Sequence, residues 1–442
     1  MARPSSSRNR KVLLRNGTVR SRGDAGRAAQ RLLSQPAEGL LFLSVLCALT
    51  LCLIPAEWDW PYNNVSVVKY SPVIFAALSI VTKLAVEPFV AGRLLKIPVL
   101  CVVGLFFFMT AGSLVRLSET GVQFEYTFSG RALCIMPYFA AALVLSDANQ
   151  AAVRKWFSDL LILAGLMMLI LLVAFDAHLI FSALIQVYHT PGVIIAAAVV
   201  GLLNTRVTVF AKLALVLASS ALFVITGKHT HLIWIAVIII SAGFFMMPAL
   251  IGRRRISRLA AIIGILAVCV LLGIVIFYVA RDKAEVATGD ARWLTYAVRL
   301  SQFENSPIVG TKFLESPLLR LEGFGWDIPT HNDYLDIMSG GGLIALALFM
   351  AALAFGAARA VGWLRRGVGQ HGTEIATPVF AILSMINFFS NPMLHLPATA
   401  ASFWAALAVC TFGLTPERDV RKTRPRVRPS LKQRYAPSGP SL

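Results

Sequence analysis

The sequence has few charged side chains. Of its 442 residues, 14% are Asp, Glu, Lys or Arg and 57% are hydrophobic, whereas a typical soluble domain carries about 25% charged residues. These proportions exclude a soluble globular protein of this length. We therefore expect a polytopic, all-α membrane protein.

Cysteine pairs and metal-binding motifs are also missing. The six cysteines lie inside apolar runs, with no C-x-x-C and no histidine at ligand spacing, and we interpret them as small core residues. The sequence has no H-E-x-x-H, no G-x-S-x-G and no glycine-rich phosphate loop. Carboxylates are sparse within the apolar runs, whereas a metal needs clustered ligands. We therefore expect no disulfide framework, no metal and no cofactor.

The formal net charge is +19, and both ends of the chain are rich in Arg, Ser and Pro. A basic tail can bind nucleic acid, but no aromatic side chains that would stack on bases are interleaved between Arg418 and Arg434. Basic tails on a membrane protein instead contact anionic lipid headgroups. We predict disordered cytoplasmic tails at residues 1–37 and 415–442, with membrane lipids as partners and no nucleic acid.

Apolar runs of roughly 17 to 25 residues predict about twelve membrane spans. They lie at residues 38–55, 66–84, 97–115, 130–146, 156–175, 189–204, 207–226, 230–251, 259–280, 341–358, 375–390 and 394–414. Residues 38–280 thus hold the first nine spans and residues 342–414 the last three. Residues 281–341 form a long connection between them, which we call the external loop.

The distribution of positive residues predicts the orientation. If both termini lie in the cytoplasm, most of the 41 Lys and Arg residues fall on the cytoplasmic side, as the positive-inside rule requires. The external loop then faces away from the cytoplasm.

The first half of the external loop predicts an amphipathic helix. Apolar residues recur at intervals of three and four between Trp293 and Leu300. Arg292 and Arg299 lie on one face of this helix, nearly two turns apart. Two guanidinium groups suit an anionic ligand such as a diphosphate, because each can make bidentate contacts. The alternative is that they contact lipid headgroups or nearby carboxylates.

The external loop ends in a candidate general base. His331 lies just before the tenth apolar run, and an imidazole there can exchange protons near neutral pH. Asn332 can orient an imidazole or a sugar hydroxyl, and Tyr334 can anchor the chain as it re-enters the bilayer. The alternative is that His331 only caps or anchors the next helix. The corner between the seventh and eighth spans also holds basic or titratable side chains, Lys228 and His229 among them.

Two motifs resemble the bacterial O-antigen ligase and polysaccharide polymerase family. The segment from His331 to Leu335, followed by Gly342 to Ile344, is similar to the family signature. Arg292 with Pro307 and Gly310 resembles the family's arginine helix, which ends in a Pro-x-x-Gly turn. These proteins are inner-membrane glycosyltransferases that move glycans from undecaprenyl diphosphate on the periplasmic side. The resemblance thus implies a GT-C-like membrane fold whose external loop is periplasmic and catalytic.

The chain also departs from the family pattern. It has Tyr296 where the family usually has Trp, Gly340 in place of an acidic residue, and Ala345 in place of a second Gly. The corner that normally reads Ser-Arg here reads Lys228-His229, and the arginine expected before the sixth span is missing. These departures leave two interpretations: either Lys228 and His229 share in binding the diphosphate, or the chain uses a different acceptor or donor.

The resemblance implies a metal-independent, inverting glycosyl transfer. His331 would be the general base on the acceptor hydroxyl, and Arg292 would be the principal diphosphate ligand. Arg299 and Lys228 would be auxiliary ligands. The acceptor is either lipid A core, as in a ligase, or another glycan, as in a polymerase of O-antigen or exopolysaccharide. The sequence does not choose between the two.

A transporter or flippase of a lipid-linked glycan is the alternative from a different class. Twelve spans with both termini inside is also a transporter layout. However, transporters of that kind often consist of two similar halves joined by a long central connection. Here the central connection, residues 204–207, is short, and no internal repeat is evident.

Overall fold

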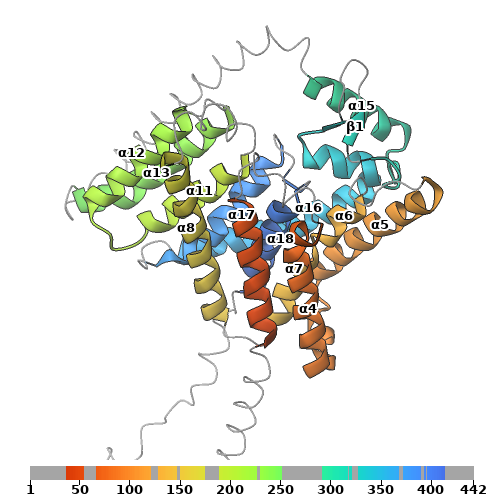
Figure 1. Cartoon of the computed structure of the whole chain (residues 1–442), viewed down its shortest axis with the longest axis horizontal. Helices are drawn as coiled ribbons and strands as arrows, with labels where there is room; N and C mark the ends of the chain where they lie inside the picture. Colours follow the sequence, from red (N-terminus) through yellow and green to blue (C-terminus); the bar gives the residue numbers. More distant parts are fainter. Residues whose placement is uncertain are drawn as a thin grey trace, which may run out of the picture.

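The computed structural model describes residues 36–53, 66–120, 128–146, 150–174, 189–225, 229–250, 291–316, 318–320, 327–367, 372–389, 393–394 and 396–413. Within these residues the chain is mainly α-helical (Figure 1). One small sheet of two antiparallel strands is added to the predicted all-α fold.

Most of the helices fall on predicted spans, and α15 (Ala291–Asn305) falls on the amphipathic helix predicted in the external loop. In chain order they are Pro36–Leu51, α3 (Ser66–Lys69), α4 (Ser71–Val86), α5 (Ile97–Thr120), α6 (Phe128–Leu133), α7 (Met136–Leu145), α8 (Gln150–Ala174), α11 (His189–Leu203), α12 (Val209–Ile225), α13 (His229–Leu250), α15 (Ala291–Asn305), α16 (Asp333–Gly367), α17 (Ala376–Asn387) and α18 (Pro397–Phe412). Short 3-10 helices, η2 (Pro88–Leu94) and η5 (Thr373–Ile375), lie between some of them. The predicted ninth span, residues 259–280, and both predicted tails lie outside the described residues.

Among the described residues, α5 and α16 contain apolar stretches that are long enough to cross a bilayer by length and composition, and the shorter apolar stretches found in other helices have 10–17 residues. The count of twelve spans therefore stays a prediction. The fourth predicted span, 130–146, is divided into α6 and α7. Pro137 lies in the first turn of α7, where its missing N–H group is tolerated, whereas it would break a continuous helix.

Helix α18 lies at the centre of the bundle. It packs against α7, α16 and α17, and all its residues are buried, as expected for a helix that is apolar on every side. On one side of this centre, α8 and α11 pack together, and α12 and α13 pack on α11. On the other side α5 packs against α16, and α15 also packs against α16.

The tenth predicted span differs most from its prediction. Helix α16 begins before the apolar run, at Asp333, and is broken inside the run at Gly342, where φ is 62° and ψ is −159°. A Cβ atom at this position would lie 2.3 Å from the carbonyl carbon and oxygen of Ile308. The break therefore needs glycine for both its backbone angles and its packing.

The chain that follows α15, residues 306–314, supplies hydrogen-bond partners for the backbone at this break. We call these residues the docking loop. Backbone hydrogen bonds run from Thr311 N to Ser339 O (2.9 Å), from Phe313 N to Gly340 O (2.7 Å), from Leu343 N to Pro307 O (2.8 Å) and from Ile344 N to Ile308 O (3.2 Å). These are the groups that a broken helix leaves without an intrahelical partner. Inside a membrane protein, backbone groups of this kind must find partners within the protein.

Phe313 anchors the docking loop in the bundle. Its side chain is fully buried, and its ring meets those of Phe108 on α5 and Phe128 on α6 edge to face, at centroid distances of 5.5 and 4.9 Å. The same ring covers Gly340 and Gly341, where a Cβ atom would lie 2.5 and 2.6 Å from it. The glycine run of α16 thus makes room for an aromatic side chain.

Replacing Gly342 by Ala is expected to lower the thermal unfolding temperature of the purified protein. The left-handed backbone alone costs roughly 1–3 kcal/mol for a residue with a side chain, and the contact with Ile308 adds to this cost. Gly243 on α13 is a matched control, because a Cβ atom there would meet nothing within 4 Å. If Gly342→Ala unfolds at the temperature of the wild type and of Gly243→Ala, the break in α16 does not depend on glycine.

Candidate active site

His331 lies in a turn between the small sheet and α16. Strand β1 (Leu318–Arg320) pairs antiparallel with β2 (Asp327–Pro329), and His331 follows β2 after one further residue. The backbone of His331 has φ = 57°, a left-handed conformation that is uncommon outside glycine. Strain of this kind persists only where the surrounding contacts hold it, and it clusters at functional sites. The side chain itself is half-buried.

Asn332 caps helix α16. Its Oδ1 accepts a hydrogen bond from the backbone N–H of Leu335 at 3.1 Å, and its carbonyl accepts one from the N–H of Asp336, as in an N-cap. The capping role, which the alternative interpretation gave to His331, therefore belongs to the next residue. The expected role of Asn332 in orienting an imidazole or a sugar stays a prediction.

Tyr334 joins α16 to α17. Its hydroxyl donates to the carbonyl of Met385 at 2.9 Å, and its ring lies 4.4 Å from that of Phe389 between centroids. Phe349 and Phe388 complete the aromatic group around it. These contacts place the tyrosine among protein side chains.

Arg299 was predicted as an auxiliary diphosphate ligand, but its side chain lies inside the protein. Its side chain is 1% exposed, and its Nε lies 3.0 Å from Oδ1 of Asp336 and donates to Oγ1 of Thr330 at 3.1 Å. Its other nitrogens donate to Gln302 Oε1 at 3.0 Å and to the carbonyl of Ser316 at 2.9 Å. Burial lowers the pKa of this guanidinium, and the Asp336 carboxylate opposes that shift. Each nitrogen of this guanidinium therefore has a partner within the protein.

Asp336 also pairs with an arginine from a distant part of the chain. Its Oδ2 lies 2.7 Å from Nη1 of Arg131 on α6, and the Arg131 guanidinium lies over the ring of Phe128 at 5.1 Å. We call Arg131, Asp336 and Arg299 the ion triad; their side chains are at most 5% exposed. Sequence reasoning missed Arg131 and Asp336. The available signal was that each is an ionisable residue at the edge of an apolar run, where charge is costly and often functional.

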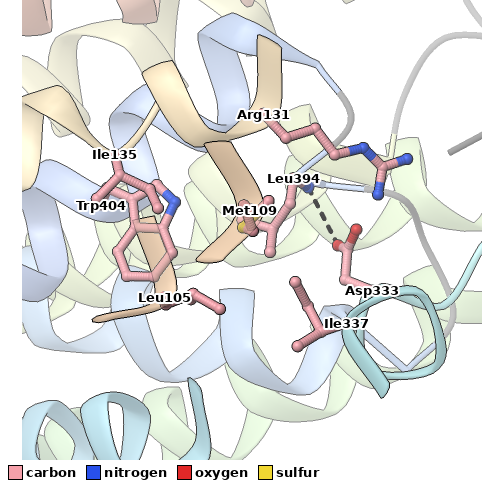
Figure 2. A pocket seen from close by; sticks show the side chains of 8 residues that line it. All are labelled: Leu105, Met109, Arg131, Ile135, Asp333, Ile337, Leu394 and Trp404. Carbon is pink, nitrogen blue, oxygen red and sulfur yellow. Dashed lines mark hydrogen bonds between the residues drawn. The ribbon is translucent and has the colours of Figure 1, made fainter. Parts of the chain in front are cut away.

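A small pocket lies beside the ion triad (Figure 2). Asp333 and Arg131 form its polar end, and Oδ2 of Asp333 accepts a hydrogen bond from the N–H of Leu394 at 3.1 Å. The remaining walls are apolar and come from Leu105, Met109, Ile135, Ile337 and Trp404. Asp333 is 1% exposed and was not among the predicted site residues.

Arg292 lies on the same helix as Arg299, about 10 Å further along its axis at 1.5 Å per residue. It is half-exposed, and α15 packs against both β2 and α16. The helix of Arg292 and the turn of His331 are therefore adjacent, joined by the hydrogen bond from Arg299 to Thr330. Of the other predicted ligands, Lys228 lies outside the described residues, and His229 is described only as the first residue of α13.

The outward face of α15 is apolar. Trp293, Leu294 and Leu300 are 59%, 48% and 42% exposed, and Ile308 in the docking loop is 64% exposed. Apolar and aromatic side chains of this kind suit the boundary between lipid and water. In the part of the chain that the structure describes, His, Cys, Asp and Glu side chains do not form a group that could hold a metal ion.

Comparison with known families gives one match. Residues 213–350 match the family model described as O-antigen ligase. The matched region runs from α12 to the first half of α16 and includes Arg292, the docking loop and His331. It thus confirms the predicted resemblance. No curated protein matches the chain.

The match bears on the general class of the protein. Its members are integral inner-membrane proteins, and the match indicates an activity of the ligase or polymerase type on glycan substrates. The ion triad lies partly outside the matched region, because Arg131 precedes it.

The cap at Asn332 yields a test that separates a structural from a chemical role. Asn332→Ser keeps a side-chain oxygen for capping, so we expect wild-type stability, and a purely structural role predicts wild-type activity as well. Asn332→Ala removes the cap and is expected to cost about 1 kcal/mol of stability. Thermal unfolding and turnover of both variants would be measured. If Asn332→Ser folds normally but loses activity, the amide takes part in the chemistry.

Proposed function

We propose that this protein is a metal-independent, inverting glycosyltransferase that moves a glycan from undecaprenyl diphosphate to a periplasmic acceptor. One observation carries the proposal: Arg299 joins the helix of Arg292 to the turn of His331, through its 3.1 Å hydrogen bond to Thr330. A candidate base and a candidate diphosphate ligand are thereby held on adjacent elements. The family match over the same residues supports the transferase class.

His331 acts as the general base in this mechanism. Its imidazole takes the proton of the acceptor hydroxyl, and the hydroxyl oxygen attacks the anomeric carbon on the face opposite the diphosphate. The bond from that carbon to the diphosphate oxygen breaks as the new glycosidic bond forms. The electron pair leaves with undecaprenyl diphosphate, and the configuration at carbon is inverted.

Arg292 holds the departing diphosphate. A fixed guanidinium stabilises charge that develops on the leaving group without reorganisation during the reaction. The apolar outward face of α15 supports this role, because a helix in the lipid–water boundary lies at the depth of a lipid-borne diphosphate. Lys228 and His229 are proposed as further ligands on the strength of the sequence alone. Arg299 is reassigned from ligand to positioning residue.

The proposed topology has twelve spans, with both termini cytoplasmic and the external loop in the periplasm. The acceptor is a lipid A core or a second glycan, so that the protein is either a ligase or a surface-polysaccharide polymerase. The match over residues 213–350 favours both over the transporter or flippase considered from the sequence.

Replacing His331 by Ala is expected to reduce glycan transfer by roughly 10²–10⁴-fold, the usual contribution of a general base. The assay would use purified protein, an undecaprenyl-diphosphate glycan and either lipid A core or a second lipid-linked glycan as acceptor. The variant must match the wild type in yield and unfolding temperature. Wild-type turnover by a folded His331→Ala variant would remove His331 from the mechanism.

Replacing Arg292 by Ala is expected to lower kcat/KM for the lipid-linked donor by about 100-fold, the typical cost of removing one transition-state donor. Arg292→Lys should fall between the two, since Lys keeps the charge but not the bidentate geometry. Arg206, an exposed arginine in the predicted cytoplasmic loop after α11, is the matched control, and Arg206→Ala should retain wild-type kinetics. If Arg292→Ala and Arg206→Ala lower kcat/KM equally, the effect comes from the loss of positive charge in general and not from a contact between Arg292 and the diphosphate.

A further inference from the structure

The ion triad contacts the chain on both sides of His331. Arg299 donates to Thr330, the residue before the histidine, and pairs with Asp336 in the first turn of the helix after it. It also donates to the carbonyl of Ser316, at the end of the segment that leads into the small sheet. One guanidinium therefore closes the turn that holds His331 and attaches it to α15.

Stability alone gives little reason for this arrangement. Taking charged groups out of water is costly, and apolar residues of similar volume often replace buried ion pairs without loss of stability. Ionisable groups buried in a membrane bundle are correspondingly rare and usually serve a function. The left-handed backbone of His331 is unfavourable for a residue with a side chain, and Arg299 and Asp336 contact the chain on either side of it.

We propose that Arg131, Asp336 and Arg299 form a positioning device that fixes the His331 turn against α15, so that the base and Arg292 face the same substrate. The inference rests on the proposed function. The triad acts through His331 and Arg292, and its members do not touch the substrate. Arg131 reaches Asp336 from α6, so that the turn is also tied to the bundle.

The charges of the triad predict an order of effects. Asp336→Asn leaves two buried guanidinium groups without their shared carboxylate. Arg131→Met leaves the ion pair of Arg299 and Asp336, whose charges cancel, and it also leaves the hydrogen bond from Arg299 to Thr330. Arg299→Lys keeps every charge but cannot reproduce the separate bonds to Thr330, Gln302 and Ser316. A positioning device therefore loses most with Asp336→Asn and least with Arg131→Met.

The experiment compares steady-state kinetics of these variants, counted per folded molecule. We expect Asp336→Asn to lower kcat by about 100-fold, as small displacements of catalytic groups do, with a smaller change in KM for the lipid-linked donor. Arg299→Lys should lower kcat by roughly tenfold and Arg131→Met by less. Glu87→Gln is the control, because it removes the carboxylate of another buried pair, Lys83–Glu87 at 3.2 Å, and should leave kcat unchanged.

Hydrogen–deuterium exchange gives a second readout that needs no activity. Peptides covering residues 327–336 should exchange faster in Asp336→Asn and Arg299→Lys than in the wild type, whereas those covering α18 should not change. Unchanged kcat per folded molecule, with or without a loss of folded protein, would overturn the proposal. Unchanged exchange would also overturn it. If Asp336→Asn fails to fold, Arg299→Lys decides by the same two measurements.

The two proposals fail in different ways. Wild-type turnover by His331→Ala, or no glycan transfer by the wild type, contradicts the proposed function, and the exchange data then still test whether the triad holds the turn. Loss of turnover in His331→Ala together with normal kinetics in Asp336→Asn contradicts only the positioning role.

Discussion

The hydrogen bonds between the docking loop and the broken helix α16 are the constraint on which the rest of the site depends. A helix that breaks inside an apolar bundle leaves backbone groups that lipid cannot satisfy, so their partners must come from within the protein. Here residues 307–313 supply the missing donors and acceptors. Because the docking loop directly follows α15, these hydrogen bonds also determine where α15, and with it Arg292, lies relative to α16.

A second, polar connection lies at the start of the same helix. Asp336 accepts contacts from Arg131 and Arg299, and Asp333 holds the backbone of Leu394. Carboxylates in the first turn of α16 also complement the positive end of the helix dipole. Backbone bonds at Gly342 and ion pairs at Asp336 thus hold one helix in two places, with His331 at its tip. A rigid scaffold of this kind can keep a strained turn in one conformation.

Much of this was predictable from the sequence. The apolar runs located the helices, because apolar length is a direct physical requirement of a bilayer span, and the motifs around Arg292 and His331 led to the family. The buried position of Arg299 was not predicted, because helical spacing shows that two arginines share a face but not whether that face meets solvent or protein. The pairing of Arg131 with Asp336 was missed, since the two residues are 205 positions apart and no local pattern connects them.

The sequence by itself determined the class of the protein, the position of most helices, the family and the candidate base and diphosphate ligand, since each follows from local composition or a short motif. Only the tertiary structure decided that the Pro-x-x-Gly turn supplies hydrogen-bond partners at the helix break at Gly342, that Asn332 rather than His331 caps α16, and that Arg299 faces inward. Each of these depends on which distant segment lies opposite a given backbone group or charge, and the energies that choose it arise only when the segments pack.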